Sequence, residues 1–234
     1  MNEDRFIERA TNHKHDTKQF REHIVFKFKE IHENVDCKHH EPCSYYLAEG
    51  ILLQQDTKGP VIECGCFQGG MSAKFSVICK EIGKELHVVD SFKGLPFDES
   101  AVHWNGKEIE WEKGDFKCIL PEVVKNIKDF GEVDVCKFHK GWVEDIVPEM
   151  EISPSLIFVD LDIVSSALVC IKHFWNRLQG DRFYTHEACY KTYMEGILDE
   201  TWWKDNLKEN PPECVGKVNG FYDARCLAYL KKVK

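Results

Sequence analysis

Three features that would assign the chain to a broad class are missing. No apolar run among its 234 residues is long enough to span a membrane, and the N-terminal M-N-E-D lacks the basic and apolar pattern of a secretory signal. A surplus of positive charge is also missing, because 31 Lys and Arg against 40 Asp and Glu give a formal net charge of −9. An acidic surface does not attract nucleic acids or anionic membranes. We therefore expect a cytoplasmic protein that binds neither.

Paired metal-binding cysteine motifs are missing as well, although the chain has 11 cysteines. Their number is odd, they are scattered, and several, such as Cys79 and Cys170, lie in apolar patterns. We expect reduced, buried thiols that pack as small hydrophobes. The segment from Cys37 to Cys43 (C-K-H-H-E-P-C) does gather four soft ligands, but the sequence has no second C-x-x-C pair that could complete a zinc site with it. A structural zinc site there is the less favoured alternative.

The dinucleotide fingerprint G-x-G-x-x-G is absent, yet residues 61–96 have the order of a nucleotide-binding unit. A short apolar strand ends in Glu63, a loop with Gly65 and Gly69 follows, and a second strand ends in Asp90. Glycines let the backbone approach a ligand, and an acid at the second strand can accept hydrogen bonds from ribose. An acid before the first glycine suits the cationic groups of S-adenosylmethionine, which has no pyrophosphate. The pattern predicts S-adenosylmethionine rather than a nicotinamide dinucleotide.

Periodicity predicts an α/β fold with a doubly wound, mostly parallel sheet, N-terminal helices and a C-terminal antiparallel hairpin. The expected helices cover 17–31, 44–55, 71–82, 119–130 and 168–178, and the expected strands cover 61–63, 86–89, 133–138, 156–159 and 183–185. We expect residues 1–16 to fray, 97–115 to form a mobile loop and 221–230 to form the hairpin. The chain divides into an N-terminal helical extension or lid, 1–55, and a cofactor-binding domain, 56–234.

Acids or a histidine follow three of the expected strands. They are Asp90, then Asp160 with Asp162, then His186 with Glu187. The carboxyl ends of parallel strands line the ligand crevice of an open sheet. A single acid there could be a helix N-cap, but polar residues at three strand ends together favour a ligand-binding or catalytic site.

Four segments resemble the successive motifs of the macrocin O-methyltransferase-like (TylF-type) family. They are 63–70, 90–96 (D-S-F-K-G-L-P), 140–142 (K-G-W) and 160–162 (D-L-D), and the resemblance runs over roughly residues 45–190. It implies a class I methyltransferase of Rossmann-like fold that uses S-adenosylmethionine to methylate hydroxyls of small molecules such as glycosides and other secondary metabolites. It also implies a divalent metal, usually magnesium.

The resemblance implies roles for individual residues. Glu63, Gly65 and Gly69 would shape the methionine end of the cofactor site. Asp90, followed by Ser91, would hold the ribose. The residues placed beside the adenine would be Gly141 and Trp142, and Asp160 would be the first metal ligand.

One departure from the family leaves two mechanisms open. Where the family has an Asp-Asp pair, this chain has His186 and Glu187, and imidazole favours zinc, iron or manganese over magnesium. In the first mechanism Asp160, His186 and Glu187 hold a divalent ion (Mg, Mn, Fe or Zn). In the second, metal-free mechanism, Asp160 or Glu187 orients His186 as general base. Asp160, Asp162 and His186 are the candidate catalytic residues.

A rival of another class is a cofactor-binding protein whose altered Asp-Asp site has lost or changed catalysis. A further expectation concerns assembly, because family members usually associate through N-terminal segments. The helix over 17–31 carries Phe20, Phe26 and Phe28 on more than one face. We therefore expect a homodimer or a higher homo-oligomer.

Overall fold

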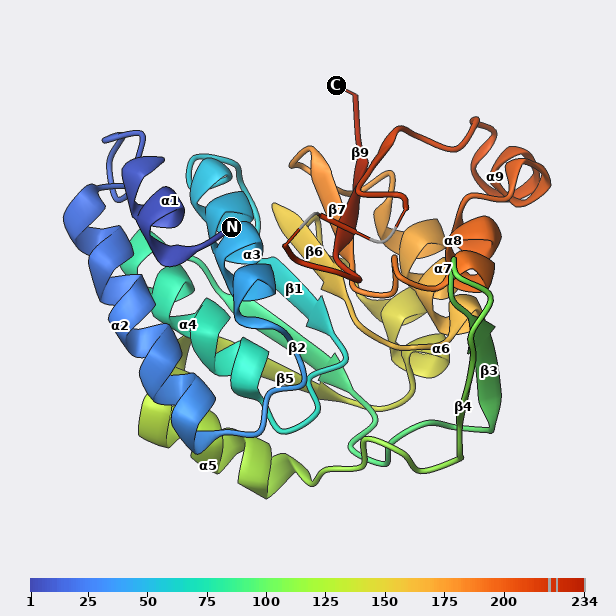
Figure 1. Cartoon of the computed structure of the whole chain (residues 1–234), viewed down its shortest axis with the longest axis horizontal. Helices are drawn as coiled ribbons and strands as arrows, with labels where there is room; N and C mark the ends of the chain where they lie inside the picture. Colours follow the sequence, from blue (N-terminus) through green and yellow to red (C-terminus); the bar gives the residue numbers. More distant parts are fainter. Residues whose placement is uncertain (219, 222, 234) are drawn as a thin grey trace.

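A seven-stranded sheet forms the centre of the molecule, in a computed structural model that describes residues 1–218, 220–221 and 223–233 (Figure 1). The strand order is β5-β2-β1-β6-β7-β9-β8, and the first five of these run parallel. The strands are β1 (Val61–Cys64), β2 (Leu86–Asp90), β5 (Cys136–Lys140), β6 (Leu156–Val159), β7 (Arg182–Thr185), β8 (Cys214–Val215) and β9 (Ala228–Lys231). The expected doubly wound α/β fold is confirmed.

Helices cover both faces of this sheet (Figure 1). They are α1 (Glu3–Glu8), α2 (Lys18–Asn34), α3 (Glu41–Leu53), α4 (Gly70–Ile82), α5 (Leu120–Phe130), α6 (Val143–Ile146), α7 (Val164–Phe174), α8 (Lys191–Ile197) and α9 (Glu200–Leu207). Within the described residues, none of them is long and apolar enough to cross a membrane.

The central strands are buried on both sides because alternate residues point to opposite faces. In β1, Val61 packs into the cluster formed with α2 to α5, and its neighbour Ile62 packs into the cluster formed with α6 to α9. All four residues of β1 and of β6 are buried. Each fully buried aliphatic side chain contributes about 1.5–3 kcal/mol. This two-sided burial holds the carboxyl ends of the strands at fixed positions.

The N-terminal segment is ordered, so the expectation that residues 1–16 fray is wrong. The Asn2 side chain caps α1, and Phe6 is buried. The fully buried Arg21 of α2 donates from Nε to Asp16 Oδ1 (2.5 Å), from Nη2 to Asp16 Oδ2 (3.0 Å) and from Nη1 to the Phe6 carbonyl (2.6 Å). A buried guanidinium needs such partners. These bonds join the polar N-terminal segment to α2, which a composition pattern does not reveal.

The phenylalanines of α2 have different surroundings. Phe28 is buried and stacks on Tyr45 with ring centroids 6.1 Å apart, and Phe20 is partly buried. Phe26 is 66% exposed. Most of the apolar face of α2 therefore packs inside its own chain, against α4 (Figure 1). A homodimer or higher oligomer stays a prediction.

The segment 97–115 contains a β-hairpin, so the expectation of an irregular mobile loop is wrong. Strand β3 (Glu99–Val102) pairs antiparallel with β4 (Glu108–Trp111). The turn between them includes Asn105 and Gly106, and Gly106 has a φ of +82°. An Asn-Gly pair between short strands is a strong hairpin signal, and it was available in the sequence.

The C-terminal antiparallel hairpin is confirmed, but its first strand lies earlier than expected. Strand β9 pairs antiparallel with β7 on one side and with β8 on the other. Strand β8 thus precedes the expected hairpin segment, 221–230, and residues 219 and 222 lie outside the described part of the chain.

Candidate active site

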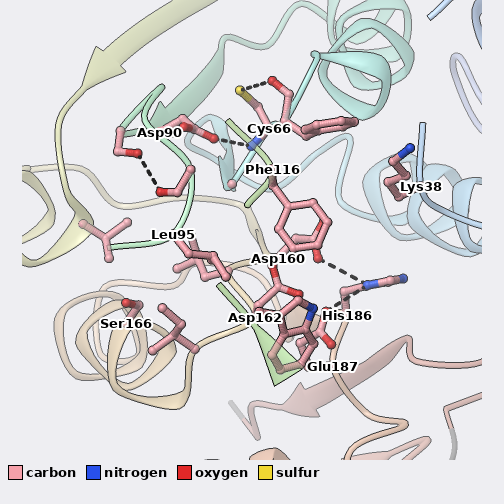
Figure 2. Close-up of a pocket in the computed structure, with 18 of the residues that line it drawn as sticks. Lys38, Cys66, Asp90, Leu95, Phe116, Asp160, Asp162, Ser166, His186 and Glu187 are labelled. Atoms are coloured by element: carbon pink, nitrogen blue, oxygen red, sulfur yellow. Dashed lines mark hydrogen bonds and ion pairs between the residues drawn. The ribbon is translucent and has the colours of Figure 1, made fainter. Parts of the chain in front are cut away.

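A cavity opens at the carboxyl ends of the parallel strands, where the chain order reverses between β1 and β6. Open α/β sheets bind ligands at this switch point. Figure 2 shows Asp90 and Cys66 in one part of the cavity and Asp160, His186 and Glu187 in another. Six carboxylates are among the lining side chains: Asp36, Asp90, Glu144, Asp160, Asp162 and Glu187. Such a wall suits a cationic ligand.

Gly65 allows the loop after β1 to touch the loop after β6. Its φ is +87°, and a Cβ on it would lie 1.9 Å from the Asp160 carbonyl oxygen. Gly65 lines the cavity. Gly69, with a φ of +83°, is buried at the N-cap of α4. The two glycines therefore differ in role, since Gly65 borders the cavity and Gly69 forms the N-cap of α4 behind it.

Asp90 holds the two loops that flank it. Its Oδ2 accepts from the Cys66 amide (2.8 Å) and its Oδ1 accepts from the Phe92 amide (2.6 Å). An ionised carboxylate offers about four acceptor positions, so each oxygen retains one for a ligand. The side chain lines the cavity. These contacts fit the predicted ribose-binding role.

The next predicted cofactor residues build the wall beside Asp90. The buried Ser91 lines the cavity, and its Oγ accepts from the Lys93 amide (3.0 Å). The Gly141 amide donates to the Asp90 carbonyl (3.0 Å) and places Trp142 at the N-cap of α6. Trp142 lines the cavity, and Lys93 Nζ lies 5.9 Å from its ring centroid. Asp90, Ser91 and Trp142 thus meet around one space, with Gly141 as support.

Glu63 lies behind the cavity, and its side chain is fully buried. Its Oε2 accepts a hydrogen bond from the Ser72 hydroxyl of α4, and its Oε1 has no hydrogen-bond partner among the described residues. Burial raises the pKa of Glu63 to about 8. A neutral carboxyl linking β1 to α4 is therefore its role in this structure, rather than a charged contact in the cavity.

The predicted catalytic residues do converge, and a histidine that the sequence analysis did not select joins them. His186 Nδ1 lies 3.2 Å from Asp160 Oδ1 and 3.1 Å from Glu187 Oε1. His39 Nε2 lies 2.8 Å from Asp160 Oδ2. The two imidazole centroids are 4.4 Å apart. His39 comes from the loop between α2 and α3, in the C-K-H-H-E-P-C segment whose ligand-like composition was its only signal.

Charges in this cluster are strongly coupled. Burial alone would raise the pKa of Asp160, but the neighbouring His39 and His186 hold it below its usual range. Burial alone would lower the pKa of each histidine, yet Asp160 raises the pKa of His39 to about 9 and that of His186 well above its ordinary value. Burial raises the pKa of Glu187. Asp160 is thus an anion held between two cationic rings.

Asp162 also faces the cavity, in a conformation uncommon for a residue with a Cβ. Its φ is +59°, a left-handed value that Asp tolerates better than most residues. Burial raises its pKa well above the ordinary value, and the charges of Glu187 and Asp160 raise it further. A carboxyl with a raised pKa at a cavity wall is suited to proton transfer.

Aromatic side chains from several segments, one of them the unexpected hairpin, complete the cavity. Trp111 of β4 and Tyr190 both line it, and their rings meet edge to face with centroids 5.2 Å apart. Phe116 lines it as well and packs against Phe67 at 6.1 Å. Trp111 was missed because the sequence was expected to be irregular over 97–115, and Tyr190 and Phe116 follow no strand or motif that would have selected them.

Not all cysteines are reduced, which corrects the expectation from the sequence. Cys189 and Cys226 form a disulfide, with Cα atoms 4.3 Å apart. The antiparallel pairing of β9 with β7 brings the chain before β9 next to the chain after β7, and the Ala188 amide donates to the Cys226 carbonyl (2.8 Å). The bond braces the segment that follows His186 and Glu187.

Two groups of described side chains have the spacing of metal ligands. One is His39, Asp160 and His186, and the other is Cys66, Asp90 and Cys118; in each group the ligand atoms lie within 4.8 Å of one another. Two atoms that bind one zinc ion at 2.0–2.2 Å stand roughly 3–3.5 Å apart. The distances of 2.8 and 3.2 Å around Asp160 are close to this spacing. The first group therefore fits a divalent metal.

The fold is shared with solved methyltransferase structures. The O-methyltransferase NovP is 16% identical with a TM-score of 0.61, over 83% of this chain and 79% of that one. Calicheamicin methyltransferase CalS11 is 14% identical with a TM-score of 0.60, over 99% and 91%. S-adenosylhomocysteine-bound PaMTH1 of Podospora anserina is 11% identical with a TM-score of 0.54, over 90% and 88%. At these identities the likeness shows the fold.

Among curated proteins, none matches the chain. The model of the macrocin-O-methyltransferase (TylF) family matches residues 47–187, which is more than half of the chain. This range contains the glycine loop, Asp90, Trp142 and the Asp160, His186 and Glu187 cluster. The chain therefore belongs to the TylF macrocin-O-methyltransferase family and is an S-adenosylmethionine-dependent methyltransferase.

Proposed function

We propose that this enzyme methylates a hydroxyl group of a small molecule, a glycoside or another secondary metabolite, with the help of a divalent metal. The observation that carries the proposal is the cavity itself. It joins the Asp90 and Trp142 wall to the cluster around Asp160. Cofactor and acceptor can therefore meet in one space.

The cofactor end is built for recognition of an adenosyl group. Asp90 has acceptor positions left for ribose hydroxyls, and the Trp142 ring offers a face for the adenine. The other lining carboxylates suit the cationic ammonium and sulfonium groups. S-adenosylmethionine, once held here, supplies a methyl group bonded to a sulfonium sulfur. When the methyl group is transferred, this sulfur departs as the neutral thioether of S-adenosylhomocysteine.

The residues of the chain would position the acceptor hydroxyl and receive its proton. Asp162 and Glu187 line the cavity next to Asp160. Their raised pKa values make the carboxylate form of each a stronger base than usual, which can accept the proton of the acceptor hydroxyl. His186 is held between Asp160 and Glu187 and is cationic while Asp160 is its partner. We assign Asp162 as the proton acceptor and Asp160 with His186 as the groups that orient the hydroxyl.

A divalent metal fits this end of the cavity, and Asp160 and His186 would hold it, with Glu187 beside them. His186 would lose its extra proton on binding the ion, because an imidazole binds a metal only in its neutral form. Bound there, the metal would lower the pKa of the acceptor hydroxyl. The imidazole donor favours zinc, iron or manganese over magnesium.

The acceptor class follows from the aromatic side chains in the cavity lining. Trp111 and Tyr190 present aromatic surface there, which packs against the apolar face of a sugar ring or against another aromatic ring. The fold relative CalS11 is described as a TDP-rhamnose 3′-O-methyltransferase. We therefore place glycosides first among the acceptors to be tested.

The N-terminal residues 1–55 would act as a lid on the domain formed by 56–234. Asp36, Cys37, Lys38 and His39 all line the cavity, although they precede the sheet in the chain. Lys38 Nζ also lies 5.5 Å from the Phe67 ring centroid. Opening this loop would give ligands access to the buried cluster.

The test is a screen of glycosides, phenols and small metabolites for methyl transfer, read by mass spectrometry of the products. We expect at least one methylated acceptor, with turnover reduced about 10²- to 10⁴-fold in Asp162→Asn. Asp134→Asn, at an exposed site paired with Lys80, is the matched control. Loss of activity in EDTA and its recovery with zinc, iron or manganese would support metal assistance. Cofactor binding with no product from any acceptor would indicate the alternative, a binding protein without catalysis.

A further inference from the structure

The loop between α2 and α3 reaches the catalytic cluster because it is seated on the first turn of α4. A Cβ on Gly70 would lie 3.0 Å from the Cys37 Cβ and 3.5 Å from its Sγ, so the absence of a side chain at Gly70 leaves room for Cys37. Val35, just before it, is buried in the core. These two contacts fix the position of the loop on the domain. His39, which follows Cys37 in this loop, lines the cavity with a side chain that is 10% exposed.

His39 is held at both ring nitrogens. Its Nε2 lies 2.8 Å from Asp160 Oδ2, and its Nδ1 lies 3.6 Å from Cys37 Sγ. Cys37 Sγ in turn lies 3.9 Å from Nζ of Lys74, which is fully buried and also donates to Ser44 Oγ (2.9 Å). Metal-binding histidines commonly have their second nitrogen bonded in this way, which fixes the ring and the tautomer. The Cys37 contact directs Nε2 of His39 toward Asp160.

We propose that His39, Asp160 and His186 together form a divalent transition-metal site with two imidazoles and one carboxylate, in which Cys37 is a positioning residue. The proposal rests on the metal assistance proposed above and adds a ligand from outside the family match, from the N-terminal extension. Each Asp160 oxygen faces a different imidazole, and the three ligand atoms lie within 4.8 Å. Glu187 contacts His186 Nδ1, the same atom that faces Asp160, and so lies beside the site.

Two consequences follow from this ligand set. Two nitrogens and one carboxylate select zinc or iron over magnesium, which prefers oxygen ligands. A metal bound to His39 would also join the N-terminal loop to the strand ends β6 and β7 from which Asp160 and His186 project. The metal would therefore fix the lid loop over the acceptor end of the cavity.

The experiment is calorimetric titration of chelator-treated, full-length protein with Zn²⁺ and with Mg²⁺. We expect one Zn²⁺ that depends on His39, with much weaker Mg²⁺ binding. His39→Ala should weaken Zn²⁺ binding by more than about 100-fold, and Cys37→Ser by about 10- to 100-fold, as for outer partners of metal ligands. His39→Gln is a second variant in case the alanine disturbs the loop.

Matched controls separate this site from others. His40→Ala changes the adjacent exposed histidine, which makes no side-chain capping bond at the start of α3. Cys118→Ser removes the second group of ligand-type side chains. Both variants should keep the His39-dependent binding. S-adenosylhomocysteine affinity should stay unchanged in His39→Ala, and this result would show that the substitution leaves the cofactor end of the cavity intact.

The outcomes distinguish this proposal from the proposed function. Zn²⁺ binding that is equal in wild type and both His39 variants overturns the site, as does a wild-type protein that binds no Zn²⁺. A wild-type protein that methylates acceptors without any bound ion contradicts the metal assistance in the proposed function. His39-dependent Zn²⁺ binding without methylation of any acceptor would support the site and contradict the proposed function.

Discussion

His39 and His186 contact different oxygens of the same carboxylate, Asp160, with their rings inclined at 75° and their centroids 4.4 Å apart. The two histidines are far apart in the chain and come from different parts of it, the N-terminal extension and the end of β7. Asp160 is therefore the point at which the lid and the sheet meet. Its neighbourhood in the cavity is also where we place methyl transfer.

The first prediction concerns cofactor binding. Asp90→Ala should weaken S-adenosylhomocysteine binding by about 1.5–3 kcal/mol, because hydrogen bonds to a charged acceptor are lost. Calorimetry measures the affinity. A melting curve should accompany it, since Asp90 also holds the Cys66 and Phe92 amides. Asp134→Asn is again the control, and an unchanged affinity in Asp90→Ala would count against the ribose assignment.

The second prediction compares two glycines with left-handed backbone. A Cβ at Gly65 would lie 1.9 Å from the Asp160 carbonyl, whereas a Cβ at Gly106 would meet nothing within 4 Å, and their φ values are +87° and +82°. Gly106→Ala should cost about 1–2 kcal/mol of unfolding free energy for the backbone alone. Gly65→Ala should cost at least about 3 kcal/mol, because the clash adds to it. Denaturant unfolding measures both, and equal losses would contradict the close approach.

The third prediction is a pH dependence of stability that arises from Glu63. Its pKa is about 8 in the folded protein and near 4.5 in the unfolded chain, so the folded state keeps a proton that the unfolded state releases between these pH values. The free energy of unfolding contributed by this group therefore falls as pH rises from about 4.5 to 8.

Glu63→Gln should remove this decline, because glutamine resembles the neutral acid. We expect little change at pH 5 and a gain of about 1–3 kcal/mol at pH 8. The exposed Glu151→Gln is the control. A Glu63→Gln protein less stable than wild type at pH 8 would show that the carboxyl is ionised in the folded state.

The fourth prediction is a count of thiols. Nine cysteines are free and one pair, Cys189 and Cys226, is bonded. Protein unfolded in denaturant without reductant should therefore react at nine thiols. Treatment with reductant first should raise the count to eleven, and peptide mapping should place the difference at this pair. Eleven reactive thiols without reductant would refute the bond.

The positions of Asp90, Asp160 and His186 were predictable from sequence, and the reason is geometric. Each follows an apolar strand, and parallel strands end at one edge of the sheet. The aromatic Trp111 was predictable in principle, because its strand pairs across an Asn-Gly turn, but the charged residues around it obscured the alternation.

His39 could not be predicted in the same way. Its place depends on how α2 and α3 pack against α4 and on the room beside Gly70, and these are contacts between segments distant in sequence. Glu63 shows the opposite limit. The sequence places Glu63 before the glycine loop, but the expected charged contact with the cofactor is wrong, because tertiary packing buries the side chain against α4 and keeps it neutral.

A crystal structure of the protein with S-adenosylhomocysteine and Zn²⁺ tests most directly whether this cavity is the site of methyl transfer. We expect the ribose on Asp90, the adenine beside Trp142 and the thioether sulfur facing Asp160, with an anomalous peak between His39, Asp160 and His186. A cofactor outside this cavity, or one whose sulfur points away from Asp160, would contradict the assignment of the cavity as the site of methyl transfer.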